Sequence, residues 1–267
     1  MNIQLKFLFT AALLFFLAPG LWAQEIETRE VVYKADGQSM VGYLAMPKGA
    51  AKGTPAVLVV HEWWGQTDYP RKRAEMLAKL GYIAMAVDMF GDRQITEHPK
   101  EAGAFAKAVF SSAKNVATRF DAAWAALVAN SPAVREKVAA IGYCFGGSVV
   151  LEMARQGAPL VAVASFHGGL MTPSKAQKGK VPARIYVANG AADPMSKPEQ
   201  IEELHQEFEA AEVDFRFESF EAAKHGFTNP QASVYAEKLN FPALGYNQEA
   251  DQKSWAHLKG FLKESFK

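Results

Sequence analysis

The chain has 267 residues, of which 49% are hydrophobic and 21% are charged, and its 29 basic and 28 acidic side chains give a formal net charge of +1. This composition, without repeats or low-complexity tracts, excludes a largely disordered chain. The balanced charge, with no long basic run, argues against nucleic acid or an anionic membrane as the main partner.

The N-terminal segment has the pattern of a secretory signal peptide. Lys6 precedes a largely apolar run over residues 7–18, and Pro19-Gly20 then leads to Ala23. The run is too short to cross a bilayer core of about 30 Å comfortably. We therefore expect residues 1–23 to be cleaved off, the protein to be exported to the periplasm or secreted, and no membrane contact to remain. An uncleaved anchor is the alternative.

Hydrophobic patterns and turn residues predict alternating strands and helices along the rest of the chain. Alternating residues around Asp36-Gly37 indicate an antiparallel hairpin, and an alanine-rich helical region is expected to break around Ser111-Ser112. In chain order the expected strands are 29–35, 40–46, 55–60, 82–87, one that begins at 138, 160–166, 183–188 and 213–220, and the expected helices are 69–80, 99–130, 149–154, 198–211 and 252–266.

This order of elements predicts an α/β fold class. Strands that alternate with helices form a mostly parallel central sheet with helices on both faces, here as a single domain over residues 24–267. In such folds the functional groups lie at the carboxyl ends of the strands. Polar residues that directly follow the strands are therefore the candidates for a site.

The most informative stretch is Gly142-Tyr143-Cys144-Phe145-Gly146-Gly147, which follows a predicted strand and precedes a predicted helix. A sharp strand-to-helix turn leaves no room for Cβ atoms two residues before and after its centre. The pattern is typical of the nucleophile elbow of an α/β-hydrolase fold, with a thiol where serine is usual. An inert buried cysteine is the alternative. Ser148 is a poor nucleophile candidate because it falls one turn into the helix.

Two further groups fall at strand ends in the order that this fold imposes, nucleophile, acid, histidine. Asp193 follows the strand 183–188, and His225 lies in a loop after the last strand. We expect His225 to take the thiol proton and later to activate water, while Asp193 fixes the imidazole tautomer. Alone, Asp before Pro is commonly a turn former and a loop His is commonly incidental.

The single cysteine of the chain cannot form an intrachain disulfide. His61, His98, His205 and His257 lack the spacing of metal ligands, so we expect no metal and no cofactor.

Together with His61-Glu62-Trp63-Trp64-Gly65, the turn 189–193 and Lys224-His225-Gly226-Phe227, the elbow resembles the dienelactone hydrolase family over about residues 28–262. The resemblance implies that Glu62 sits beside the cysteine and accepts its proton when substrate arrives, so that the thiol rests neutral and oxidises slowly. It also implies an oxyanion hole from the backbone N–H groups of Trp63 and Phe145.

The resemblance is weaker for the substrate. Members that act on dienelactone hold its carboxylate with two arginines; Arg93 can match the first, but Thr228-Asn229-Pro230 stands where the second is expected. A neutral ester or lactone in an aromatic pocket is therefore favoured. The residues expected to bind it are Trp64, Phe90, Arg93, His167 and Phe227.

The sequence thus predicts a carboxylic ester or lactone hydrolase that forms a thioester acyl-enzyme from a small-molecule substrate. A monomer is expected, with an oligomer left open. A hydrolase-fold binding protein without turnover is the alternative. A thiol redox protein ranks last because a resolving cysteine is missing. Whether residues 231–247 form a lid is left open.

Overall fold

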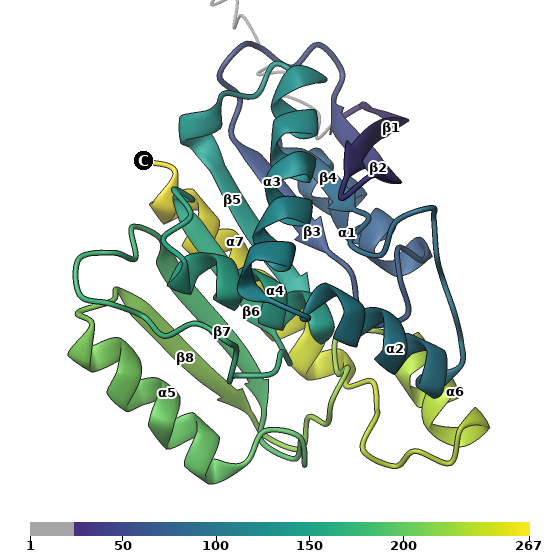
Figure 1. Cartoon of the computed structure of the whole chain (residues 1–267), viewed down its shortest axis with the longest axis vertical. Helices are drawn as coiled ribbons and strands as arrows, with labels where there is room; N and C mark the ends of the chain where they lie inside the picture. Colours follow the sequence, from purple (N-terminus) through teal and green to yellow (C-terminus); the bar gives the residue numbers. More distant parts are fainter. Residues whose placement is uncertain (1–23) are drawn as a thin grey trace, which may run out of the picture.

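A computed structural model describes residues 24–267, and the predicted signal peptide lies outside the described residues. Eight strands form one sheet in the order β1-β2-β4-β3-β5-β6-β7-β8 (Figure 1). Their bounds are β1 (Ile26–Ala35), β2 (Gln38–Pro47), β3 (Ala56–Val60), β4 (Ile83–Val87), β5 (Val138–Tyr143), β6 (Ala162–Phe166), β7 (Arg184–Gly190) and β8 (Phe215–Phe220). Only the pairs β1–β2 and β2–β4 are antiparallel, so the expected mostly parallel sheet is confirmed.

The strand sequences explain this arrangement. Every residue of β3, β4 and β5 is buried, as expected for unbroken apolar runs in the centre of a parallel sheet. The hairpin of β1 and β2 closes at Asp36 and Gly37, both with positive φ, which a tight two-residue turn requires.

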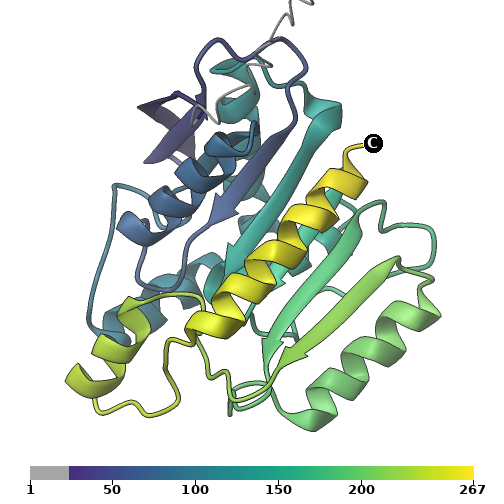
Figure 2. The same ribbon diagram turned by 180° about the vertical axis from the view of Figure 1, so that it is seen from behind.

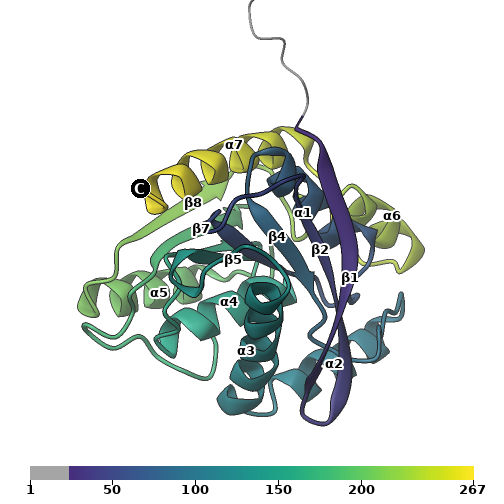
Figure 3. The same cartoon turned by 90° about the horizontal axis from the view of Figure 1, so that it is seen from above.

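Helices cover both faces of the sheet, as predicted (Figures 2 and 3). α1 and α7 share one hydrophobic cluster with the strands, whereas α3, α4 and α5 share the cluster on the opposite face. The helices are α1 (Asp68–Lys79), α2 (Pro99–Val109), α3 (Ala113–Ala129), α4 (Phe145–Arg155), α5 (Pro198–Ala210), α6 (Gln231–Lys238) and α7 (Gln248–Ser265). In the described part of the chain, none is both long and apolar enough to cross a bilayer.

Polar caps set two helix boundaries. The expected break lies between α2 and α3, where the Ser112 side chain accepts a hydrogen bond from the Asn115 N–H at 3.1 Å. α7 begins four residues before the predicted start because the Asn247 side chain caps it through the Ala250 N–H at 3.0 Å. α6 lies in the stretch for which the sequence predicted no element.

Candidate active site

Cys144 stands between β5 and α4 with φ +53, a left-handed backbone conformation that is strained for any residue except glycine. A Cβ atom on Gly142 would lie 2.0 Å from the Gly146 carbonyl oxygen, and one on Gly146 would lie 2.3 Å from the Val60 carbonyl oxygen. These contacts confirm the steric reason for both glycines. The turn presents the sulfur at the carboxyl edge of the sheet.

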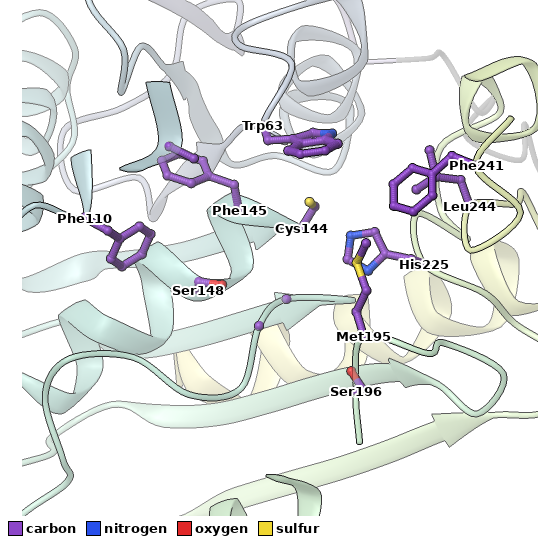
Figure 4. Close-up of a pocket in the computed structure, with 13 residues that line it drawn as sticks. Trp63, Phe110, Cys144, Phe145, Ser148, Met195, Ser196, His225, Phe241 and Leu244 are labelled. Atoms are coloured by element: carbon purple, nitrogen blue, oxygen red, sulfur yellow. The ribbon is translucent and has the colours of Figure 1, made fainter. Parts of the chain in front are cut away.

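Asp193 and His225 reach the same edge from loops after β7 and β8. The Nδ1 atom of His225 lies 2.8 Å from Oδ2 of Asp193, and both side chains are buried. The His225 ring and the Cys144 sulfur line the same cavity, where Figure 4 shows the two side chains as neighbours. Because Asp193 occupies Nδ1, Nε2 is the nitrogen free to face the sulfur.

The electrostatic surroundings of His225 favour its charged form. Burial by itself lowers the pKa of His225, but the negative charge that Cys144 carries as a thiolate and the hydrogen bond to Asp193 raise that pKa to about 10. His225 can therefore hold a proton at neutral pH and can donate it.

Two backbone N–H groups come from residues that line the cavity together with Cys144. The Phe145 N–H is the first of α4, and the Trp63 N–H lies in the loop after β3. Within residues 24–267 neither N–H donates a recorded hydrogen bond to another protein group. Both side chains line the same cavity as Cys144 (Figure 4). A free N–H at the N-terminus of a helix, as at Phe145, suits a developing negative charge on oxygen.

Glu62 follows β3 and is only 5% exposed. Burial raises the pKa of its carboxyl to about 7, against the opposing effects of a hydrogen bond from Asn229 and the charges of His225 and Arg73. Its recorded hydrogen-bond partner in the described chain is Asn229, not Cys144. Sequence reasoning treated Asn229 only as the place of a missing arginine.

His167, which was expected to bind substrate, does not line the cavity at Cys144 and instead contacts the backbone of the elbow. It is 1% exposed, its Nδ1 accepts a hydrogen bond from the Cys144 N–H at 3.2 Å, and its Nε2 lies 2.7 Å from Thr228 Oγ1. Burial, together with the charges of His225 and Arg73, lowers the pKa of His167 well below its ordinary value. The neutral ring fits the acceptor role at Nδ1.

The other four residues expected to bind substrate also lie elsewhere. Arg93 forms a bidentate ion pair with Glu30 of β1, at 2.6 and 2.5 Å. The aromatic side chains are buried in packing contacts: Phe90 against His61 and Phe145, Phe227 against Phe220 and His167, and Trp64 against Tyr235. None of the four lines the cavity at Cys144.

The cavity at Cys144 has a volume of about 290 Å³ and walls that are mostly apolar. Among the described residues that form it there is no lysine or arginine. Its lining comprises Trp63, Ala106, Phe110, Cys144, Phe145, Ser148, Gly168, Gly169, Met195, Ser196, His225, Phe241 and Leu244. Sequence reasoning missed most of these walls. The nearest signals were Met195, two residues after Asp193, and Phe241, in the segment whose lid role was left open.

A mostly parallel sheet with a strained cysteine turn after β5, an acid after β7 and a histidine after β8 defines an α/β-hydrolase. The chain belongs to the dienelactone hydrolase family, whose model matches residues 40–266. It is 29% identical to a putative carboxymethylenebutenolidase of Synechocystis sp., over 91% of this chain and 99% of the relative. It is 27% identical to a putative carboxymethylenebutenolidase of Aquifex aeolicus, over 78% of this chain and 90% of the relative.

Solved structures agree with this family. A dienelactone hydrolase-like promiscuous phosphotriesterase from metagenomic libraries superimposes with a TM-score of 0.84 and 33% identity, over 91% of this chain and 99% of that one. A putative dienelactone hydrolase from Klebsiella pneumoniae, at 21% identity, shares the fold with a TM-score of 0.72 over 90% and 99%. The protein is therefore a carboxylic ester hydrolase for small-molecule esters or lactones.

Proposed function

We propose that the protein hydrolyses neutral carboxylic esters or lactones through a thioester on Cys144, with His225 as acid and base and Asp193 as its partner. The observation that supports this most is the His225 ring, which is hydrogen-bonded at Nδ1 to Asp193 and lines the same cavity as the Cys144 sulfur. The three groups come from distant parts of the chain. Chance rarely assembles such a sequence of nucleophile, base and acid.

In the proposed first half-reaction the Cys144 thiolate attacks the ester carbonyl carbon and the C–S bond forms. The carbonyl electron pair moves to the oxygen, which the Trp63 and Phe145 N–H groups stabilise. As the intermediate collapses, the C–O bond breaks and His225 Nε2 gives its proton to the leaving alcohol. In the second half-reaction Nε2 takes a proton from water, the hydroxide attacks the thioester, and the C–S bond breaks to release the acid.

Glu62 is proposed to accept the Cys144 proton when substrate arrives, so that the thiol stays neutral in the resting enzyme. A buried carboxyl whose pKa is about 7 can hold or release a proton near neutral pH. Its side chain lies near the turn after the catalytic histidine, since a Cβ atom on Gly226 would be 3.9 Å from Glu62 Oε1. A thiol that stays neutral without substrate would resist oxidation.

The cavity walls support a neutral substrate. A substrate carboxylate needs a cationic partner when it is buried, and the described lining offers no lysine or arginine. We expect short neutral esters and neutral lactones to be hydrolysed with a higher kcat/KM than lactones that carry a carboxylate. A preference for the acidic lactones would contradict this assignment.

The thioester is tested by rapid quench of the enzyme with a p-nitrophenyl ester, followed by intact mass measurement. We expect an acyl adduct that maps to Cys144 and that Cys144→Ala neither forms nor turns over. Full esterase activity of Cys144→Ala would overturn the proposal. Tight binding of ester without any product release would favour the binding-protein alternative instead.

A second candidate activity is phosphotriester hydrolysis. The relative at 33% identity is described as a promiscuous phosphotriesterase, and the apolar cavity with its two backbone donors suits an uncharged phosphoryl centre as well as a carbonyl. Paraoxon and p-nitrophenyl acetate release the same chromophore, which allows a direct comparison of rates. Turnover of paraoxon that disappears in Cys144→Ala would establish this activity at the same site.

Export and assembly are also proposals. The leader pattern supports cleavage after Ala23 and a periplasmic or secreted enzyme. A monomer is the simplest assembly, because every proposed catalytic group comes from one chain.

A further inference from the structure

We propose that Cys144 divides the cavity into two arms with different duties, an inference that rests on the proposed ester hydrolysis. The acyl arm, formed by Ala106, Phe110 and Ser148, would hold the acid part of the ester. The alcohol arm, formed by Met195, Phe241 and Leu244, would hold the part that leaves. All six residues line the cavity, and Figure 4 shows Phe110 and Ser148 on one side of the sulfur and Phe241 and Leu244 on the other.

The acyl arm is built on the helices next to the elbow. Ser148 lies one turn after Cys144 in α4, Ala106 lies in α2, and Phe110 follows the end of α2. The Phe110 ring meets the Phe145 ring edge-on, with centroids 5.6 Å apart. Ala106 and Phe110 pack against the large cluster that contains Phe145. This wall therefore rests mainly on α2, α4 and the cluster around Phe145, although Ala102 of α2 also packs in the cluster that contains Leu244.

The alcohol arm is built on the histidine itself. Residues 239–247, here called the strap, run beside His225: the His225 N–H donates to the Ala243 carbonyl at 3.1 Å, and the Gly245 N–H donates to the His225 carbonyl at 3.1 Å. Leu244 lies between these two bonds and pairs with His225 in a parallel bridge. On the other side, the Met195 N–H donates to Asp193 at 2.8 Å.

Trp63 marks the boundary between the arms. Its side chain packs against the cluster of the acyl arm and also against the cluster of Phe241 and Leu244. In Figure 4 it lies over the Cys144 sulfur. Trp63 therefore lies where the two proposed arms meet, beside the reacting atom.

The chemistry assigns each arm. Asp193 occupies Nδ1 of His225, so the proton for the leaving oxygen has to come from Nε2, and the two atoms must approach to about 2.6–3.2 Å. This places the alcohol part on the His225 side. The carbonyl oxygen is directed to the N–H groups of Trp63 and Phe145. The acyl substituent takes the remaining direction, away from His225 and toward Phe110.

The division has a kinetic consequence. After the alcohol has left, water enters the alcohol arm while the acyl arm stays occupied by the thioester. Side chains of the acyl arm should therefore affect both formation and hydrolysis of the acyl-enzyme. Side chains of the alcohol arm should affect formation only.

The experiment compares Phe110→Ala and Leu244→Ala with the unchanged enzyme on two series of aliphatic esters. One series keeps a methyl alcohol and lengthens the acid from acetyl to hexanoyl; the other keeps an acetyl group and lengthens the alcohol from methyl to hexyl. We expect Phe110→Ala to raise the hexanoyl-to-acetyl ratio of kcat/KM about tenfold and to leave the alcohol ratio unchanged. We expect Leu244→Ala to raise the hexyl-to-methyl ratio of kcat/KM about tenfold and to leave the acid ratio unchanged.

Decay of the acyl-enzyme in single-turnover mass measurements separates the arms further. Phe110→Ala should change the decay rate of the hexanoyl-enzyme, whereas Leu244→Ala should leave it within about twofold. Two further variants test the same assignment if Phe110→Ala or Leu244→Ala folds poorly. Ala106→Leu narrows the acyl arm, and Phe241→Ala widens the alcohol arm. If Phe110→Ala acts on the alcohol series, or if neither ratio moves, the assignment of arms is wrong while the Cys144 adduct still stands. Loss of that adduct would overturn the proposed function itself.

Discussion

At the scale of single residues, the buried Glu62 carboxyl links stability to pH. The native protein keeps this proton up to about pH 7 because burial raises the pKa, whereas the unfolded chain releases it near pH 4.5. The native state binds more protons in this window, so the free energy of unfolding falls as the pH rises from 4.5 to 7. The contribution is about 3 kcal/mol at most.

Glu62→Gln removes this titration. We expect the difference in unfolding free energy between this variant and the unchanged enzyme to shift by about 3 kcal/mol between pH 4.5 and 7 in favour of the variant. Urea unfolding of both proteins across the range measures it. Parallel pH profiles for the two proteins would show that Glu62 is ionised in the native state.

The ion pair between Asp193 and His225 should matter more for turnover than for folding. Asp193→Asn places an amide at Nδ1 and no longer stabilises the imidazolium, so kcat should fall by about 10³- to 10⁴-fold. His167→Gln is the matched control, since it alters the acceptor for the Cys144 N–H, which also donates to the Phe166 carbonyl at 3.0 Å. A loss below about tenfold is expected there. Equal losses from both variants would contradict a special role for Asp193.

At the scale of elements, the elbow between β5 and α4 tolerates no added side chain. Gly146→Ala would press a Cβ atom to 2.3 Å from the Val60 carbonyl oxygen of a central strand. We expect it to lower the free energy of unfolding by about 3 kcal/mol. Gly103→Ala in α2 is the control, because its Cβ meets nothing within 4 Å and helix propensity should stabilise it by about 0.5–1 kcal/mol.

Thermal and urea unfolding of the two glycine variants measure this contrast. A Gly146→Ala protein as stable as the parent would mean that the elbow relaxes. In that case the strain at Cys144 would not depend on close packing against β3.

The elements, and the placing of Cys144, Asp193 and His225 at one edge of the sheet, were predictable because their signals are local. Buried parallel strands carry unbroken apolar runs, as in 55–60, and the elbow requires glycine at 142 and 146 for steric reasons that a sequence displays directly. The acid and the histidine follow from the order of strands. Each of these inferences depends on a few neighbouring residues and on one topological rule.

The substrate pocket was not predictable in the same way. Phe110 and Phe241 come to the cavity through packing between distant segments, and no local pattern distinguishes them from other aromatic residues. Phe90 and Phe227, which stand next to strand-end motifs, turn instead into the protein and fill its core. Arg93 forms an ion pair with Glu30 of β1. Sequence spacing does not reveal this partner.

At the scale of the whole molecule, the proposed signal peptide would determine where the mature chain begins. Cleavage after Ala23 would leave a protein that begins at Gln24 and carries 28 basic and 28 acidic residues. Expression of the full chain in a bacterial host and mass measurement of the periplasmic fraction should give this species. A product that keeps residues 1–23 and sediments with membranes would support the anchor instead.

The bonds between the strap and His225 bear on how such an enzyme can change its substrates over evolutionary time. A mutation that reshapes the acyl arm at Phe110 would leave His225 and Asp193 in place. Esters with a different acid part would then become substrates through single substitutions. Changes to the backbone beside Leu244 would displace His225, because the two are hydrogen-bonded. Most such variants would lose activity and be removed by selection. Related sequences should therefore vary first in the acyl arm, and insertions in the strap should be rare among active relatives.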